Sequence, residues 1–208
     1  MNAALNIFGN RAATGMERPI NVTKRVKSMN SIRAFIALAV APNVVRNILR
    51  CQDELASQAG DCVRWTPDEQ IHLTLQFLGN ISPADLEVIQ ARLQDVMKPL
   101  HLRAHGLGGF PSLRNPRVIW VGLTGDIDQL KSVQAAVETA TGRSEERKFH
   151  PHLTIGRVRE GRHLNVTLDP WKDHDFGEWD IRELLLMQSK LSPKGATHSV
   201  IARFRPAP

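Results

Sequence analysis

The nine residues FHPHLTIGR at positions 149–157 contain a His-x-Thr pattern, and HLTL at positions 72–75 repeats its centre earlier in the chain. In both copies apolar and polar residues alternate, which is the period of a β-strand. The histidine and threonine of each copy therefore share one face of a strand, and the apolar residues share the other. We expect the apolar faces to pack and the His/Thr faces to be available for chemistry.

The two copies place His72, Thr74, His152 and Thr154 in the same local arrangement. An imidazole titrates near neutral pH and can act as a general acid or base, and a threonine hydroxyl can donate a hydrogen bond to a charged oxygen. One copy alone is an ordinary half-buried strand, but recurrence of the same polar pair favours a single site with two halves. These groups suit transfer or hydrolysis at phosphorus.

The 208-residue chain has the composition of a soluble globular protein and is long enough for one sizeable domain or two small lobes that share a core. No apolar run approaches the roughly 20 residues that span a bilayer, and the first residues lack the apolar stretch of a secretory signal. We therefore expect a cytoplasmic protein with no membrane partner. Cys51 and Cys62 are not at metal-ligand spacing and are expected to be reduced, structural thiols.

Residues 1–30 differ from the rest of the chain. They show no sustained periodicity and hold five basic side chains against one acidic one, which is much of the net charge of +6. We predict a disordered basic extension, followed by a single folded domain at residues 31–208. Two alternatives are that translation starts at Met29 and that the basic, acid-poor start is an organelle transit peptide.

Apolar periodicity and turn residues predict alternating strands and helices after residue 31. Helices are expected to begin and end, in turn, at Pro42 and Gly60, at Pro83 and Pro99, and at Asp126 and Gly142. Strands are expected at the second motif and at residues 32–40, 63–65, 71–78, 100–107, 118–123, 179–191 and 197–204. This order favours an α+β protein with partly antiparallel strands, helices packed outside and the motif strands facing a cleft. His152 follows His72 by 80 residues, which indicates an internal duplication.

Four segments together resemble the two-histidine phosphoesterase superfamily, and within it the RNA 2',3'-cyclic phosphodiesterases historically named 2'-5' RNA ligases. They are RAFIA at 33–37, HLTLQFLG at 72–79, PRVIWVG at 116–122 and FHPHLTIGR at 149–157. The resemblance extends from about Ser31 to the end of the chain. It departs near the C-terminus, where members often carry an aromatic residue after a Gly turn and this chain has His198.

The resemblance implies a two-lobed, pseudo-duplicated fold in which largely antiparallel sheets line a concave cleft, with helices packed outside and no metal or cofactor. His72 resembles the general acid that protonates the departing 3' oxygen, and His152 resembles the general base that activates water. Thr74 and Thr154 would bind phosphate oxygens. Two positioned imidazoles suffice for in-line attack of water on a strained cyclic phosphate.

Arg157 stands out in a basic cluster around the second motif, which comprises Arg143, Arg147, Lys148, Arg157, Arg159 and Arg162. Most of these side chains are expected to be solvated loop charges. Arg157 matches the arginine that contacts the phosphate in the resembling family, and a guanidinium suits that task because it can donate two parallel hydrogen bonds. Strict alternation after Leu153 would aim Arg157 at the core, so a twist or bulge at Gly156 is required.

Other conspicuous residues carry weaker expectations. An aromatic group that could stack a base comprises Phe35, Trp65, Phe77 and Trp120, although aromatic residues in apolar strands usually lie in the core. His150 is expected at the cleft rim because Pro151 interrupts the strand. Surface or loop positions are expected for His101, His105, His163, His174 and His198.

The leading functional hypothesis is metal-independent hydrolysis of RNA or nucleotide 2',3'-cyclic phosphates to a 2'-phosphomonoester, with RNA or oligonucleotide ends and cyclic nucleotides as partners of a monomeric enzyme. Weak 2'-5' ligation would be the same chemistry in reverse. Two alternatives stay open. One is another two-histidine activity, on ADP-ribose cyclic phosphate or 2'-5' oligonucleotides, and the other is a non-catalytic RNA-end binder.

Overall fold

The computed structural model describes residues 31–144, 148–192 and 195–206. The predicted extension at residues 1–30 and Arg147 of the basic cluster lie outside the described residues. The strands are β1 (Ile32–Ala39), β2 (Val63–Trp65), β3 (His72–Ile81), β4 (Leu100–Phe110), β5 (Val118–Gly125), β6 (His152–Val158), β7 (Asp175–Ile181), β8 (Leu184–Ser192) and β9 (Gly195–Phe204). The helices are α2 (Pro42–Ala59), α3 (Pro83–Arg92) and α4 (Ile127–Thr141), with short 3-10 turns η1 (Gly60–Cys62), η2 (Asp68–Gln70) and η3 (Asp169–Trp171).

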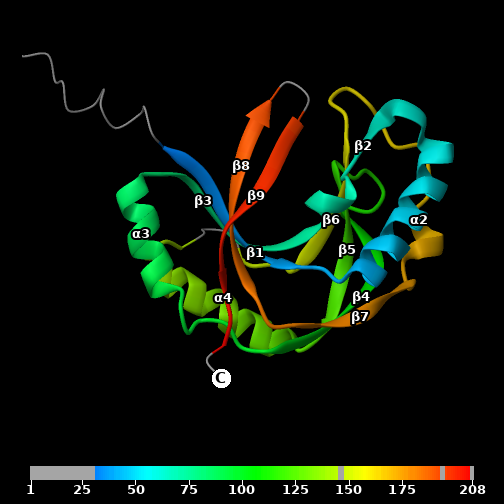
Figure 1. The fold of residues 1–208 in the computed structure, drawn as a ribbon. Coiled ribbons are helices and arrows are strands. Elements are labelled where there is room, and N and C mark those ends of the chain that lie inside the picture. The colour runs from blue at the N-terminus through cyan, green and yellow to red at the C-terminus, as the bar shows by residue number, and fades with distance from the viewer. Residues whose placement is uncertain (1–30, 145–147, 193–194, 207–208) are drawn as a thin grey trace, which may run out of the picture.

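All described strands belong to one antiparallel sheet with the order β7-β4-β5-β6-β3-β1-β8-β9, and β2 pairs with β6 (Figure 1). The motif strands β3 and β6 meet at the middle of this order through the single pair Leu73 and Leu153. On either side of this pair the chain repeats a strand-helix-strand unit, β1-α2-β3 and β5-α4-β6, whose two strands are antiparallel neighbours. The predicted α+β class and the pseudo-duplicated, two-lobed organisation are thus confirmed.

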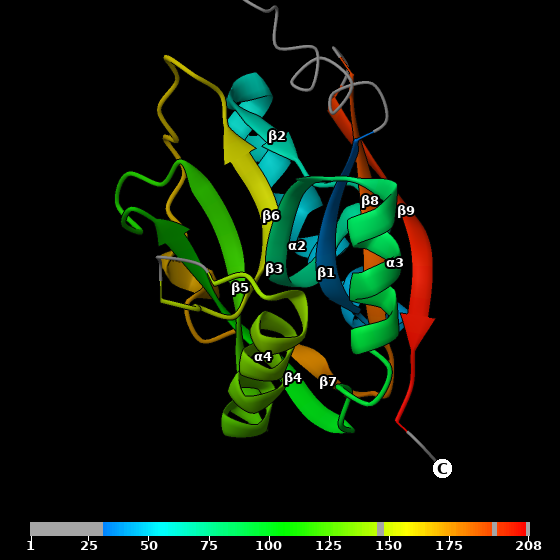
Figure 2. The same ribbon diagram turned by 90° about the vertical axis from the view of Figure 1, so that its left-hand side faces the viewer.

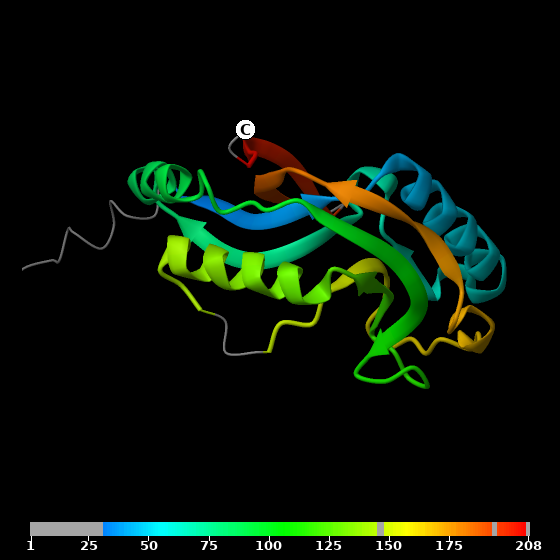
Figure 3. The same cartoon turned by 90° about the horizontal axis from the view of Figure 1, so that it is seen from below.

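Each long helix packs against the other half of the sheet: α2, from the β1-α2-β3 unit, contacts the half that contains β5 and β6, and α4, from the β5-α4-β6 unit, contacts the half that contains β1 and β3. Helix α4 lies along β3, and α2 lies beside β7, as Figure 3 shows from below. Helix α3 packs beside α4 on the same side of the sheet (Figure 2). Because the helices cross over, the two lobes share one apolar core.

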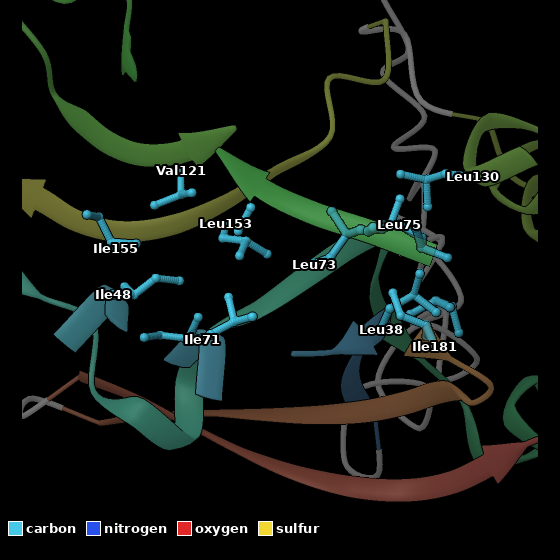
Figure 4. Close-up of a cluster of buried hydrophobic side chains, with 14 of the residues drawn as sticks. Leu38, Ile48, Ile71, Leu73, Leu75, Val121, Leu130, Leu153, Ile155 and Ile181 are labelled. Atoms are coloured by element: carbon cyan, nitrogen blue, oxygen red, sulfur yellow. The ribbon is translucent and has the colours of Figure 1, made fainter. Parts of the chain in front are cut away.

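That core is built on the apolar faces predicted for the two motifs. Leu73, Leu75, Leu153 and Ile155 are buried and meet side chains from both long helices, among them Ile48 (Figure 4). Burying four such side chains contributes on the order of 1.5–3 kcal/mol each. Packing of this face leaves the other face of β3 and β6 toward the cleft.

The helix boundaries follow local capping chemistry. Ser82 accepts a hydrogen bond from the Asp85 backbone N–H at 3.1 Å, and Gly142 ends α4 in the left-handed conformation with φ of 65°. Asp126 occupies the predicted N-cap of α4, but its carboxylate instead accepts a hydrogen bond from the His101 backbone N–H at 2.8 Å. None of the described helices is long and apolar enough to cross a membrane.

The predicted boundaries differ most from the structure at two places, and the strands expected to end at residues 78 and 107 each run three residues further. Residues 179–191 do not form one strand but belong to β7 and β8, which lie in different lobes of the sheet. The apolar pattern runs through the break because both strands are buried, so periodicity could not reveal it. Helix α3 ends at Arg92 rather than before Pro99, and buried Leu93 and Met97 continue the apolar pattern without a helix.

Candidate active site

A β-bulge in β6 orients Arg157. In the pairing with β5, Trp120 lies opposite Thr154 and Ile119 opposite Gly156, so Ile155 has no partner and is the extra residue. The bulge shifts the alternation by one position, and Arg157 therefore lies on the cleft side instead of in the core. The predicted bulge is present, and it lies at Ile155, next to Gly156.

Gly156 is required at this point by close packing. A Cβ atom there would lie 2.9 Å from Val63 Cγ1 and 3.0 Å from Trp65 Cε3, because β2 pairs directly over β6. The bulge itself is held from α2, where the buried Gln52 Nε2 donates to Ile155 O at 2.7 Å and to Thr66 O at 2.9 Å. Ile155 O also accepts from the Thr66 backbone N–H at 2.9 Å, so the carbonyl of the extra residue has two donors.

The first motif contains a bulge at the matching residue. In the pairing of β1 with β3, Ala37 lies opposite Thr74 and Ile36 opposite Gln76, so Leu75 is the extra residue. Phe77 then corresponds in position to Arg157 of the second motif. It is 60% exposed and lines the cleft, where the sequence expectation had placed it in the core with the other aromatic residues.

The central pair of leucines brings the four catalytic candidates together. Because β3 and β6 are antiparallel around Leu73 and Leu153, the residues on either side place His72 next to Thr154 and Thr74 next to His152. All four line one cleft of about 480 Å³, together with Arg157. The structure thus unites every residue that the sequence predicts for the site.

His72 begins β3 and lies in a largely buried aromatic setting. Its ring stacks on Phe35 with centroids 4.9 Å apart, and His198 meets it edge-on at 5.3 Å. Burial, and next the neighbouring His198, lower the pKa of His72 to about 4, while a backbone hydrogen bond to Gln70 acts in the opposite direction. The ring is therefore neutral at pH 7 when the cleft is empty of anions.

His152 begins β6 and is held in a similar way. Its Nδ1 donates to the carbonyl of His150 at 2.7 Å, so Nδ1 carries a proton and Nε2 is the titrating nitrogen. Burial lowers the pKa of His152 most, the His150 hydrogen bond raises it, and the charges of His150 and Arg157 lower it further. In both motifs a backbone group two residues before the histidine fixes the ring.

The cleft is cationic. Arg33, Arg64 and Arg157 line it, and within the described ranges no carboxylate lies at salt-bridge distance from any of the three. Arg64 of β2 lies directly opposite Arg157 of β6, and burial followed by this like charge lowers the pKa of Arg157. Two facing guanidinium groups without a carboxylate form a site for an anion.

Sequence reasoning missed Arg64, His198 and the cleft position of Phe77. His198 was expected at the surface or in a loop, but it lies in β9 against Phe35 and His72. Residues of the β8-β9 hairpin, of β2 and of η2 line the cleft, and Gln70 of η2 donates to Ala196 O of β9 at 2.8 Å. Figure 1 shows the hairpin and β2 as separate parts of the ribbon. The one signal in the sequence was that His198 stands where members of the similar family often carry an aromatic residue. The alternating pattern of a strand does not show which other strand lies beside it.

The remaining basic residues of the cluster that are described do not line the cleft. Arg143 donates to Leu78 O at 3.1 Å, Arg159 donates to Asp61 O at 2.8 Å, and Arg162 pairs with Asp61 at 3.4 Å.

Cys51 and Cys62 are buried free thiols, and burial raises the pKa of Cys51 to about 12. The expectation of structural thiols is therefore confirmed.

Fold and cleft together define a two-histidine phosphoesterase. The sequence pattern of the LigT-like phosphoesterase family matches residues 38–120 and again residues 121–198, once for each half of the molecule, and the chain belongs to this family.

Similar proteins agree with this assignment. The RNA 2',3'-cyclic phosphodiesterase of Archaeoglobus fulgidus is 30% identical, with 83% of this chain and 99% of the relative aligned. The protein of the same name from Aquifex aeolicus is 27% identical over 85% of this chain and 98% of the relative. The crystal structure of E. coli LigT complexed with 3'-AMP has the same fold, with a TM-score of 0.69, 20% identity, and coverage of 86% of this chain and 100% of that chain.

Proposed function

We propose that the chain hydrolyses 2',3'-cyclic phosphates at RNA or nucleotide ends to 2'-phosphomonoesters, without a metal. The observation that carries this proposal is the pairing of Leu73 with Leu153, which sets two His-x-Thr motifs side by side in one cationic cleft, with the two histidines at diagonal positions. In-line displacement at phosphorus needs a base and an acid on opposite sides of the reacting group. The name shared by the relatives supports the same substrate class.

In the proposed reaction His152 Nε2 takes a proton from water, whose oxygen forms a bond to phosphorus. The bond from phosphorus to the 3' oxygen breaks, and His72 Nε2 donates its proton to that oxygen. Thr74, Thr154 and Arg157 donate hydrogen bonds to the phosphate oxygens, on which charge develops. The products are a 2'-phosphate and a free 3' hydroxyl.

The assignment of the acid and the base comes from the family resemblance, and the charges around each ring bear on it. Arg157 disfavours a proton on His152, which suits a base. The low pKa of His72 would disfavour an acid in the empty cleft. Since an anion beside a buried imidazole raises its pKa, the substrate phosphate would bring His72 into its protonated form.

The decisive assay measures turnover of a nucleoside 2',3'-cyclic phosphate in excess chelator, with the product isomer identified by phosphorus NMR. We expect multiple turnovers and only the 2'-phosphate. Binding without turnover would indicate an RNA-end binder, and a 3'-phosphate product or a requirement for added metal would contradict the mechanism. Turnover restricted to ADP-ribose cyclic phosphate or 2'-5' oligonucleotides would assign one of the other two-histidine activities.

A further inference from the structure

The cleft continues along β1 beyond the catalytic residues. Arg33, Phe35 and Ala37 share one face of this strand, and Ala37 lies opposite Thr74 of the first motif. Arg33 follows four residues away, which is about 13 Å of strand. Both Arg33 and Phe35 line the cleft, so its β1 wall leads from the catalytic centre past an aromatic ring to an arginine.

The middle of this wall is aromatic. Phe35 lies 6.0 Å from Phe77 and 4.9 Å from His198, measured between ring centroids. Phe35 is only 2% exposed and supports the wall from behind, whereas the ring of Phe77 is 60% exposed and presents its surface to the cleft. Apolar and aromatic surface of this kind accommodates a nucleoside but offers nothing to a phosphate. The cleft therefore has two polar ends separated by an aromatic middle.

The end of the cleft at Arg33 and His198 has features of an anion-binding site. Arg33 is exposed on the cleft side and has no carboxylate at salt-bridge distance within the described ranges. Next to it, His198 has a buried Nδ1 without a hydrogen-bond partner among the described residues. Burial, and then the charge of Arg33, lower the pKa of His198, so the two groups share one electrostatic environment. The Nδ1 atom is itself inaccessible, so the contact that the cleft offers here is the unpaired guanidinium of Arg33, with the His198 ring beside it. An unpaired guanidinium favours an oxygen-rich anionic ligand.

We propose that Arg33 and His198 form a second anion subsite, which binds the phosphate on the 5' oxygen of the nucleoside whose 2',3'-cyclic phosphate lies between His72 and His152. This inference rests on the proposed function. The 5' oxygen of a ribose lies at the opposite end of the sugar from its 2' and 3' oxygens. A nucleotide placed along the wall would therefore direct its 5' phosphate away from the histidines and toward Arg33.

The opposite end of the cleft does not offer an equivalent subsite. Arg64 lies across from Arg157 in the pairing of β2 with β6, so both guanidinium groups serve the phosphate at the histidines. Arg33 is on a different strand, opposite Asn80 of β3, and is separated from them by the aromatic wall. The subsite thus selects a nucleotide or RNA end over a nucleoside cyclic phosphate that lacks a 5' phosphate.

The test compares kcat/KM of the full chain for three substrates: a nucleoside 2',3'-cyclic phosphate, its 5'-phosphorylated form, and a dinucleotide that ends in the cyclic phosphate. We expect the two substrates with a 5' phosphate to be preferred about tenfold or more, the worth of one charge-assisted contact. In Arg33→Gln this preference falls to about one, and Arg33→Lys restores part of it through the retained charge.

Arg92→Gln on the exposed surface of α3 is the matched control, with an unchanged preference. If only the dinucleotide depends on Arg33, the ligand is an RNA phosphodiester; if only the 5'-phosphorylated nucleoside does, it is a nucleotide. An equal rate for all three substrates, or a preference that survives in Arg33→Gln of unchanged melting temperature, overturns the subsite but leaves the proposed function standing. No turnover of any of the three refutes the proposed function itself.

Discussion

The two halves of the sheet carry the same tetrapeptide in different surroundings. Both motif strands start with the histidine, bulge at the fourth residue and pack a central leucine, yet the residue two positions beyond the bulge is Phe77 in one half and Arg157 in the other. Aromatic rings meet both histidines, Phe35 and His198 at His72 and Phe110 at His152, but only His152 also has the charge of Arg157 acting on its pKa. The two halves therefore present equivalent His-x-Thr pairs, and they differ after the bulge, where one half has an exposed aromatic ring and the other a charge.

Removing either histidine should have the largest effect. Acid and base act in one transition state, so His72→Ala and His152→Ala should each lower kcat by about 10²- to 10⁴-fold. The double variant should be scarcely slower than the worse single variant, because groups that act together are non-additive. Steady-state kinetics with a cyclic nucleotide measures all three. Activity near that of the unmodified chain in either single variant would remove that histidine from the mechanism.

Arg157→Lys should have the next largest effect. The ammonium keeps the charge but cannot form two parallel hydrogen bonds, so kcat/KM should fall by about 10- to 100-fold, or roughly 1.5–3 kcal/mol. Arg159→Lys is the control, since the exposed Arg159 side chain donates to the backbone of Asp61 and does not line the cleft. Equal kinetics for the two variants would show that the bulge does not deliver Arg157 to the substrate.

The buried glutamines allow the two halves to be compared directly. Gln52→Leu removes the side-chain donor to Ile155 O and Thr66 O, although the Thr66 backbone N–H still donates to Ile155 O at 2.9 Å. Gln76→Leu removes a donor to Arg143 O and an acceptor for Thr141. Each should lower the free energy of unfolding by about 1–3 kcal/mol. Gln52→Leu should also lower kcat/KM more, since the Gln52 side chain donates to the bulge that orients Arg157 and the Gln76 side chain does not. Urea unfolding and kinetics on both variants test this, and equal kinetic losses would show that the anchor is purely structural.

The pH dependence should reveal the two environments. The pKa of His72 is about 4 and that of His152 lies below its usual value, so kcat/KM, which reports the free enzyme, should peak below pH 6.5. It should fall on the acid side as the base gains a proton and on the alkaline side as the acid loses one. Because bound phosphate raises both pKa values, kcat should peak at a higher pH. Coincident maxima for kcat and kcat/KM would contradict this coupling.

The smallest effect is expected from removing residues 1–28. Among the described residues, those that line the cleft all lie within residues 33–198, so a chain starting at Met29 should keep its melting temperature and its turnover of a cyclic mononucleotide. Only binding of a longer RNA should weaken, more so at low salt, if the basic residues contact phosphates. A large drop in melting temperature would place the extension in the core and move the predicted domain boundary.

The sequence alone predicted much of this site, because His-x-Thr repeated on an alternating apolar background is a local pattern. Period-2 alternation assigns His72 and Thr74 to one face and their leucine neighbours to the other, and the structure confirms that assignment. Capping residues such as Ser82 and Gly142 likewise marked helix ends, since their effect is exerted within a few residues.

Tertiary structure alone decided which segments meet. Arg157 reaches the cleft because of the bulge at Ile155, whose carbonyl accepts hydrogen bonds from Gln52, 103 residues earlier in the chain, and from the backbone of Thr66. His198 becomes a neighbour of His72 because β9 pairs with β8, and β8 with β1. Periodicity describes the faces of one strand but carries no information about which strand lies beside it. Burial and charge in the cleft, and with them the pKa values of both histidines, depend on that pairing.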